Sequence, residues 1–198
     1  MLETCSATSA EADATSAPGG SVASEIVNEL ERERALLEID QRLSRMLDLT
    51  LDALDAEIGS VLLVSSDCRM RIVAARGLPS EVVRNTCMEL GEGISGHVAL
   101  TGEGLLVRNV ESDDRFRRQN RERYYTPSCV SAPLLVEGAV RGVLNVSNKR
   151  DRSRFGLPEL ALTARVGADV ARILTPTELG QWCLSSLRGV RIGTPPRD

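Results

Sequence analysis

Apolar residues recur at helical spacing in the first third of the chain. From Ser24 onward they stand three, four or seven positions apart, with charged residues between them. This spacing places the apolar side chains on one face of an α-helix, and Ser24 can cap its start. The apolar positions are Ile26, Leu30, Leu37, Leu43, Leu47, Leu51 and Leu54.

This predicted helix is longer than one small domain can cover. At 1.5 Å per residue, an unbroken helix from Ser24 to Leu54 would extend to about 50 Å. We expect the excess, Ser24 to Leu37, to pack against a partner chain. A kinked helix that folds back on its own domain is the alternative.

Short β-prone runs follow the helix. The first two flank a polar turn at residues 65–67, and the last two flank Glu137-Gly138, so each pair predicts a hairpin. The predicted strands are residues 61–64, 71–75, 105–110, 129–136 and 139–147.

Three further segments complete the predicted order. Residues 79–88 predict a short helix, residues 113–125 an arginine-rich helix or loop, and Pro158 opens a last helix that ends near Leu174. Consecutive hairpins with helices between them indicate an α+β fold, in which helices cover an antiparallel sheet.

Composition and charge exclude several classes of protein. The chain is 42% hydrophobic and 26% charged, and its net charge of −4 argues against nucleic acid or an anionic membrane as partner. The sequence shows neither a secretory signal nor an apolar run of about 18 residues, so we expect a cytoplasmic protein. The cysteines form no CxxC pair, and His97 is the single histidine, so no metal site is expected.

The glycines of residues 91–96 match the G-x-G-x-x-G pattern of dinucleotide-binding proteins, and Glu111 follows at a suitable distance. That site requires a strand before the glycines and a full helix after them. Residues 85–90 are a poor strand, and the helix expected over residues 97–101 is stopped by Gly102. The pattern therefore does not predict a dinucleotide site.

The same glycines carry a different resemblance. Together with several later segments in the same order, they resemble the signature of the GAF domain family, and the similarity runs from about residue 34 to 174. The segments are residues 91–103, 107–110, 113–116, 128–134 and 142–149, with Phe155.

The resemblance implies a regulatory domain with a ligand pocket on one sheet face and dimerising terminal helices on the other. We expect a disordered leader over residues 1–22, a GAF-like domain with an N-terminal dimerisation helix over 23–174, and a weakly ordered tail over 175–198. No attached catalytic or output domain is expected. The residues that we expect to border the pocket are Arg115, Phe116, Tyr125, Ser128, Ser131 and Asn145.

The richest basic cluster has two interpretations. Its guanidinium groups suit a ligand phosphate, or they form a solvated surface balanced by neighbouring acidic residues. His97 likewise suits a haem ligand or a base, or a surface histidine that caps a short helix. The arginines are Arg115, Arg117, Arg118, Arg121 and Arg123.

Asn148, Lys149 and Phe155 resemble part of the signature of GAF domains that bind cyclic nucleotides. In that signature the phenylalanine is followed by Asp-Glu, and the lysine pairs with the aspartate. Here Glu159 and Leu160 stand at those two positions. Lys149 is the only lysine of the chain, and we expect it to pair with Glu159 and fix the closing strand to the last helix.

Some GAF proteins reduce free methionine sulfoxide with cysteines around the pocket. This chain has Ser95 at the position of the key cysteine, and the other expected positions, near Asn85 and Glu122, are not cysteine either. Cys87 and Cys129 are out of register. The resemblance therefore predicts a protein without catalytic activity, and a thiol-dependent reductase is the alternative.

The resulting functional prediction is a sensory domain without a cofactor. It binds a small molecule, with a cyclic nucleotide as one candidate, and signals through a helical homodimer to a separate protein. A ligand-free dimerisation scaffold, with its pocket filled by its own side chains, is the second interpretation.

Overall fold

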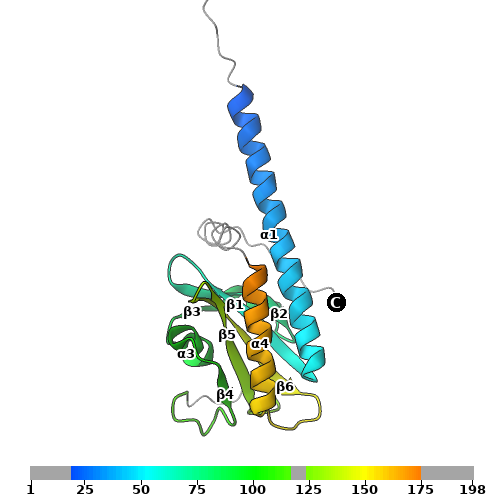
Figure 1. Ribbon diagram of the computed structural model, residues 1–198, viewed down its shortest axis with the longest axis vertical. Coiled ribbons are helices and arrows are strands. Elements are labelled where there is room, and N and C mark those ends of the chain that lie inside the picture. The colour runs from blue at the N-terminus through cyan, green and yellow to red at the C-terminus, as the bar shows by residue number, and fades with distance from the viewer. Residues whose placement is uncertain (1–18, 117–123, 175–198) are drawn as a thin grey trace, which may run out of the picture.

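The computed structural model describes residues 19–116 and 124–174. Six antiparallel strands form one sheet in the order β3-β2-β1-β6-β5-β4 (Figure 1). The strands are β1 (Ala56–Val64), β2 (Arg69–Arg76), β3 (Cys87–Glu89), β4 (Leu105–Val107), β5 (Cys129–Val136) and β6 (Ala139–Lys149). Both predicted hairpins, β1–β2 and β5–β6, are present.

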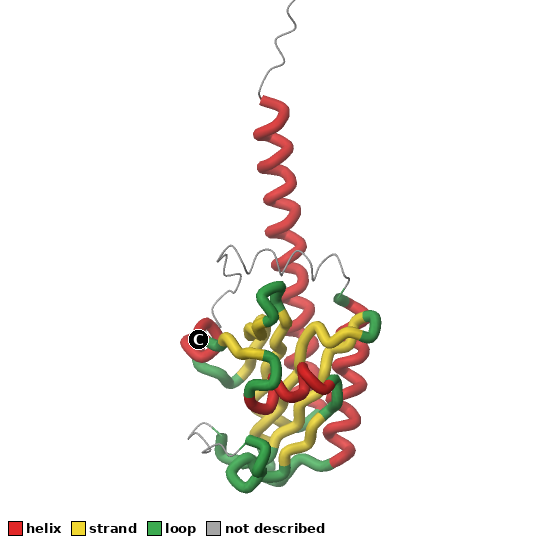
Figure 2. Tube along the Cα trace, turned by 90° about the vertical axis from the view of Figure 1, so that its left-hand side faces the viewer, coloured by secondary structure: helices red, strands yellow, loops and turns green. Residues whose placement is uncertain are grey.

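Helices cover both faces of the sheet. The long helices α1 (Gly19–Ala53) and α4 (Leu157–Ile173) pack on one face, which we call the helix face. The short helices α2 (Ser80–Asn85) and α3 (Gly93–Thr101) cover the other, which we call the cavity face (Figure 2). The fold is therefore α+β, as predicted.

Helix α1 is unbroken over its 35 residues, so the interpretation as a helix that folds back is wrong. From Ile39 onward it buries apolar side chains against the sheet, whereas its N-terminal half projects beyond the domain (Figure 1). It begins at Gly19, ahead of Ser24. The exposed apolar residues of the projecting half are Val22, Ile26, Val27, Leu30 and Leu37.

The core of the helix face requires close contact between α1 and β1. Gly59 lies at this contact, where an added Cβ would be 2.8 Å from Leu47 Cδ1 and 2.9 Å from Leu51 Cδ2. Leu47 is fully buried. The missing side chain at Gly59 therefore lets the helix rest directly on the strand.

The prediction of a helix over residues 79–88 is wrong for residues 86–88. Helix α2 ends at Asn85 because Thr86 adopts an extended backbone, and Met88 then pairs with Met70 as part of edge strand β3. The glycine pattern follows from the same packing: an added Cβ on Gly96 would lie 2.6 Å from the Glu89 carbonyl oxygen. These glycines join β3 to α3.

Three predictions about how well a segment is ordered, or which structure it adopts, fall on residues outside the described ranges. They are the leader up to residue 18, the arginine-rich segment 117–123 and the tail from residue 175. Gly19–Val22, expected in the leader, belong to α1. None of the described helices is long and apolar enough to cross a membrane.

Candidate functional site

A cavity of about 340 Å³ lies between the sheet, including its edge strand β3, and the short helices α2 and α3. Its volume falls at the lower end of the range of about 300–1,000 Å³ that is typical of small-molecule pockets. Residues two apart on β1 and β6 line it, as the repeat of a strand requires. The lining includes Ile58, Ser60, Leu62, Ile72, Asn145 and Ser147 from the sheet, and Leu78, Val82, Met88, Glu92, Ile94 and Ser95 opposite.

A polar row crosses the three central strands at the cavity. In the strand register Ser60 stands opposite Asn145, and Asn145 opposite Ser131. Ser131 Oγ donates to Asn145 Oδ1 at 2.7 Å, and Asn145 Nδ2 donates to Ser60 Oγ at 3.3 Å. Both serines are buried, and Ser131 lies behind the lining. These bonds offset the cost of burying polar groups in a sheet.

Helix α3 adds a third hydroxyl to this row. Ser95 Oγ donates to the same Asn145 Oδ1 at 3.3 Å. A primary amide has two N–H groups, and only one of those on Asn145 is used within the described residues. The second N–H of this half-buried side chain is available to a molecule in the cavity.

The described lining carries one charged side chain, that of Glu92. Glu92 directly precedes α3, and its Oε2 accepts the backbone N–H of Glu89 at 3.0 Å. Most of the other lining side chains are apolar or carry a neutral hydroxyl, amide or thiol.

Two residues at another part of the lining differ in hydrogen bonding. Ser128 Oγ accepts the backbone N–H of Phe155 at 3.1 Å, which ties the cavity to the connection between β6 and α4. The hydroxyl of Thr126 is buried and has no hydrogen-bond partner in the described part of the chain. A buried polar group without a partner costs folding free energy.

The connection between β6 and α4 is held by Lys149 and Glu159. Lys149 Nζ lies 2.8 Å from Glu159 Oε1, and Glu159 Oε2 accepts the backbone N–H of Gly156 at 2.9 Å. This one hydrogen bond from Lys149 lowers the pKa of Glu159 and raises the pKa of Lys149. Beside the pair, Phe155 and Asn148 are buried. Asn148 adopts a φ of 59°, and the chain leaves the strand here.

Arg115 and Phe116 lie outside the cavity lining. Arg115 pairs with Asp113 at 2.8 Å, which lowers the pKa of that carboxyl. Its guanidinium carbon is 5.1 Å from the centre of the Phe116 ring, which meets His97 edge to face at 5.6 Å. His97 thus packs against an aromatic ring, and no cluster of three or more metal-ligating residues occurs in the described ranges.

Tyr125 also points away from the lining. It is 41% exposed, and the Arg152 guanidinium carbon lies 5.5 Å from the centre of its ring. Its neighbour Tyr124 lines the cavity. Of the six residues predicted for the pocket, Ser128 and Asn145 line it, and Ser131 supports Asn145 from behind.

Comparison with known proteins identifies the family. A sequence profile of the GAF domain matches residues 37–175. The chain belongs to the GAF family. A probable 3',5'-cyclic phosphodiesterase from Caenorhabditis elegans, pde-5, is 36% identical over 74 residues, which are 36% of this chain and 10% of that protein. The Nif-specific regulatory protein of Azospirillum lipoferum is 32% identical over 124 residues, or 61% of this chain and 20% of that protein.

The solved structures agree on the GAF fold. The GAF domain of an Acinetobacter phosphoenolpyruvate-protein phosphotransferase superposes with a TM-score of 0.58 at 21% identity, covering 81% of this chain and 96% of that one. This chain therefore spans a small part of the two sequence relatives and nearly all of this isolated domain.

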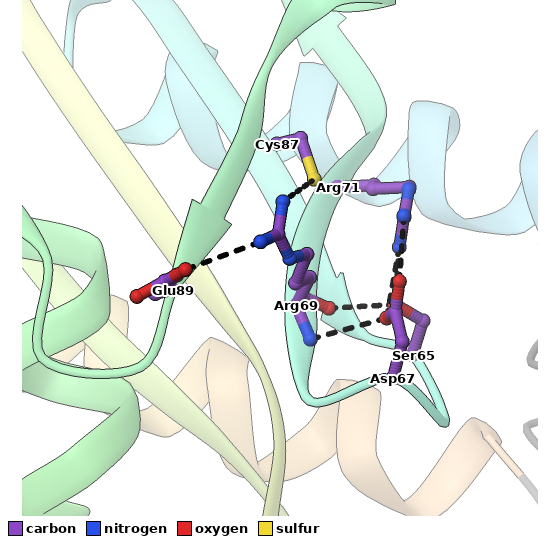
Figure 3. Close-up of polar contacts among 6 residues, drawn as sticks. All are labelled: Ser65, Asp67, Arg69, Arg71, Cys87 and Glu89. Carbon is purple, nitrogen blue, oxygen red and sulfur yellow. Dashed lines mark hydrogen bonds and ion pairs between the residues drawn. The ribbon is translucent and has the colours of Figure 1, made fainter.

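Of the three described cysteines, Cys87 and Cys129 line the cavity. Cys87 is exposed, lines the cavity at the sheet edge, and its sulfur accepts a hydrogen bond from Arg69 Nη1 at 3.8 Å (Figure 3). Arg69 also pairs with Glu89 at 3.2 Å, and the contact with Cys87 is the first cause of the raised pKa of Arg69. At the position expected for the reacting thiol of a sulfoxide reductase stands Ser95, bonded to Asn145.

Sequence reasoning missed Ser60, Ser95 and Tyr124 as parts of the site. Ser60 carries a usable signal, because a single hydroxyl stands inside the apolar run from Ile58 to Val64. For Tyr124 no signal distinguishes it from Tyr125, since the segment before it has no regular period.

Proposed function

We propose that this GAF domain is a sensory module in which a small molecule binds in the cavity and changes the packing of α1. The observation that supports the proposal lies in β1, which borders both the cavity and α1. Ser60 lines the cavity, and its neighbour Gly59 lies directly beneath α1. A ligand that moves Ser60 therefore displaces the strand on which Leu47 and Leu51 rest, because a packed core transmits small shifts.

The projecting half of α1 supplies the output in this proposal. Its exposed apolar residues include Val22, Ile26 and Leu30, four positions apart, and Leu37 one heptad later. A stripe at this spacing suits a second parallel helix. We propose that two copies pair through α1 and that the paired helices pass the signal to a separate protein.

The relatives support a regulatory role, since one is named as a regulatory protein and another as a cyclic-nucleotide phosphodiesterase. A cyclic nucleotide is therefore one candidate ligand. The open cavity favours a ligand-binding module over a scaffold with a filled pocket. Cys68 and Cys87 are free thiols, which fits action in the reducing cytoplasm.

The ligand-binding part is tested by thermal unfolding against a metabolite library that includes cyclic mono- and dinucleotides. A ligand at a hundredfold excess over its Kd adds about 2.7 kcal/mol to the free energy of unfolding. A compound that raises Tm in the wild type and not in Ser60→Leu, whose larger side chain occupies the cavity, supports the proposal. A library without such a compound argues for the scaffold.

The output part is tested by light scattering of Leu30→Glu. This charge should prevent pairing through α1, while Asn28→Glu adds the same charge on the same turn and should leave the dimer intact. A dimer that survives Leu30→Glu would show that α1 is not the interface.

A further inference from the structure

The polar row of Ser60, Asn145 and Ser131 restricts which classes of ligand the cavity can bind. We propose that the cavity binds a small uncharged molecule, mainly apolar, whose carbonyl oxygen or ring nitrogen accepts a hydrogen bond from the Asn145 amide. The inference rests on the proposed function and deepens it, because it names the class of ligand.

The first argument is the fixed orientation of Asn145. Its Oδ1 accepts from Ser131 at 2.7 Å and from Ser95 at 3.3 Å, and one N–H donates to Ser60 at 3.3 Å. An amide held by three hydroxyls cannot rotate without breaking these bonds. The remaining N–H is thus a donor fixed before binding, which reduces the entropy that a ligand must lose.

The second argument is what this amide can recognise. Both bonds to Oδ1 come from protein hydroxyls, so the amide offers the ligand a donor and little acceptor capacity. A ligand that accepts one hydrogen bond satisfies it. A ligand that can only donate, such as an ammonium or amidinium group, leaves the N–H unpaired, and that costs affinity.

The third argument is charge. The described lining contains a single ionic side chain, Glu92, among apolar groups such as Ile58, Ile72 and Ile94. A carboxylate or phosphate ligand would lose its hydration against these walls and meet a carboxylate of the same sign. An uncharged acceptor avoids both costs, so this inference removes cyclic nucleotides, which carry a phosphate, from the candidate ligands.

The fourth argument is size. The volume of about 340 Å³ accommodates one ring with a short substituent more readily than a dinucleotide, since drug-sized ligands use pockets of up to about 1,000 Å³. The ligand class is therefore a carboxamide, cyclic imide or similar small heterocycle.

Three probes that share one aromatic ring and differ in net charge test this inference. Benzamide is neutral and accepts, benzoate accepts and is anionic, and benzamidine is cationic and only donates. Binding is measured by ligand-observed NMR and competition on the full chain. We expect benzamide to bind wild type at least about tenfold more tightly than benzoate or benzamidine, which is the effect of one hydrogen bond or one uncompensated charge.

The variant Asn145→Asp sharpens the test, because a carboxylate still accepts from Ser131 and Ser95, accepts from Ser60 once that hydroxyl turns, and has no N–H to donate. The affinity of this variant for benzamide should be at least about tenfold weaker than that of the wild type, and benzamidine should become the probe that it binds most tightly. Asn109→Asp is the matched control: it makes the same change outside the cavity, where Oδ1 accepts the Glu111 N–H at 3.0 Å, and should leave the order unchanged.

The outcomes separate this inference from the proposed function. Benzoate binding as tightly as benzamide would reveal a cation in the site and overturn the inference, while the cavity would remain a ligand site. The absence of binding by all three probes also overturns it, and the library screen still decides the proposed function. Benzamide binding that survives Asn145→Asp overturns the assignment to the Asn145 amide.

Discussion

The two faces of the sheet use the same strands and are filled differently. On the helix face Val61 and Leu144 are fully buried beneath α1 and α4. On the cavity face the next residues along β1 and β6, Ser60 and Asn145, are polar and border empty volume. The alternation of a strand thus separates a packed layer from a binding layer one residue apart.

The difference shows how one sheet can be both stable and open. A shift of one residue in register would place Ser60 and Asn145 under α1, and Val61 and Leu144 in the cavity. The burial of the apolar face therefore also fixes the position of each polar group. The helix face supplies most of the stability, and the cavity face is free to differ. The comparison leads to four predictions.

The largest effect is expected from large-to-small substitutions on the two faces. Leu47→Ala removes a fully buried side chain and should lower the free energy of unfolding by about 3 kcal/mol. Ile72→Ala, at a half-buried residue beside existing empty volume, should cost about 1 kcal/mol. Urea unfolding measures both. Equal losses would contradict the contrast between the faces.

The second prediction concerns two hydroxyls on the cavity face. Ser131→Ala removes the donor at 2.7 Å from Asn145 and should cost about 1 kcal/mol of unfolding free energy. Thr126→Val removes a buried hydroxyl that has no hydrogen-bond partner among the described residues, and it should leave stability unchanged or raise it by about 1 kcal/mol. Thr163→Val, which breaks a bond of 2.7 Å to the Glu159 carbonyl, is the control and should destabilise.

The third prediction concerns the pair Lys149–Glu159, which joins the end of β6 to α4. The pKa of Glu159 is lowered in the folded protein, so the pair stabilises above the unfolded pKa of about 4.3 and is lost as pH falls through the folded value. Glu159→Gln should cost about 1 kcal/mol at pH 7, because the pair is only partly exposed, and less at pH 3, below the unfolded pKa. Thermal unfolding at both pH values tests this, and a cost independent of pH would exclude the ionic contribution.

The smallest effect is expected at Arg115. Its pair with Asp113 is half exposed, so Arg115→Ala should change stability by no more than about 0.5 kcal/mol. Because Arg115 lies outside the lining, the Kd of a cavity ligand should stay the same. A tenfold weaker Kd would instead place Arg115 in the site, as the sequence suggested.

The two hairpins and the terminal helices could be predicted because each follows a local period. Strand β3 could not, since its three residues pair with β2 only after Met70 and Met88 meet in the folded sheet. The site shows the same division. Ser128, Ser131 and Asn145 lie on or beside regular strands, whereas Arg115 and Tyr125 lie in an irregular segment where the direction of a side chain has no sequence signal.

The two edge strands, β3 and β4, have a consequence for assembly. Each is three residues long, in a sheet whose central strand β6 has 11. An exposed strand edge is a template on which a further chain can add and start a fibril. Edges this short offer few backbone groups for pairing, so the addition of a further strand onto β3 or β4 is disfavoured.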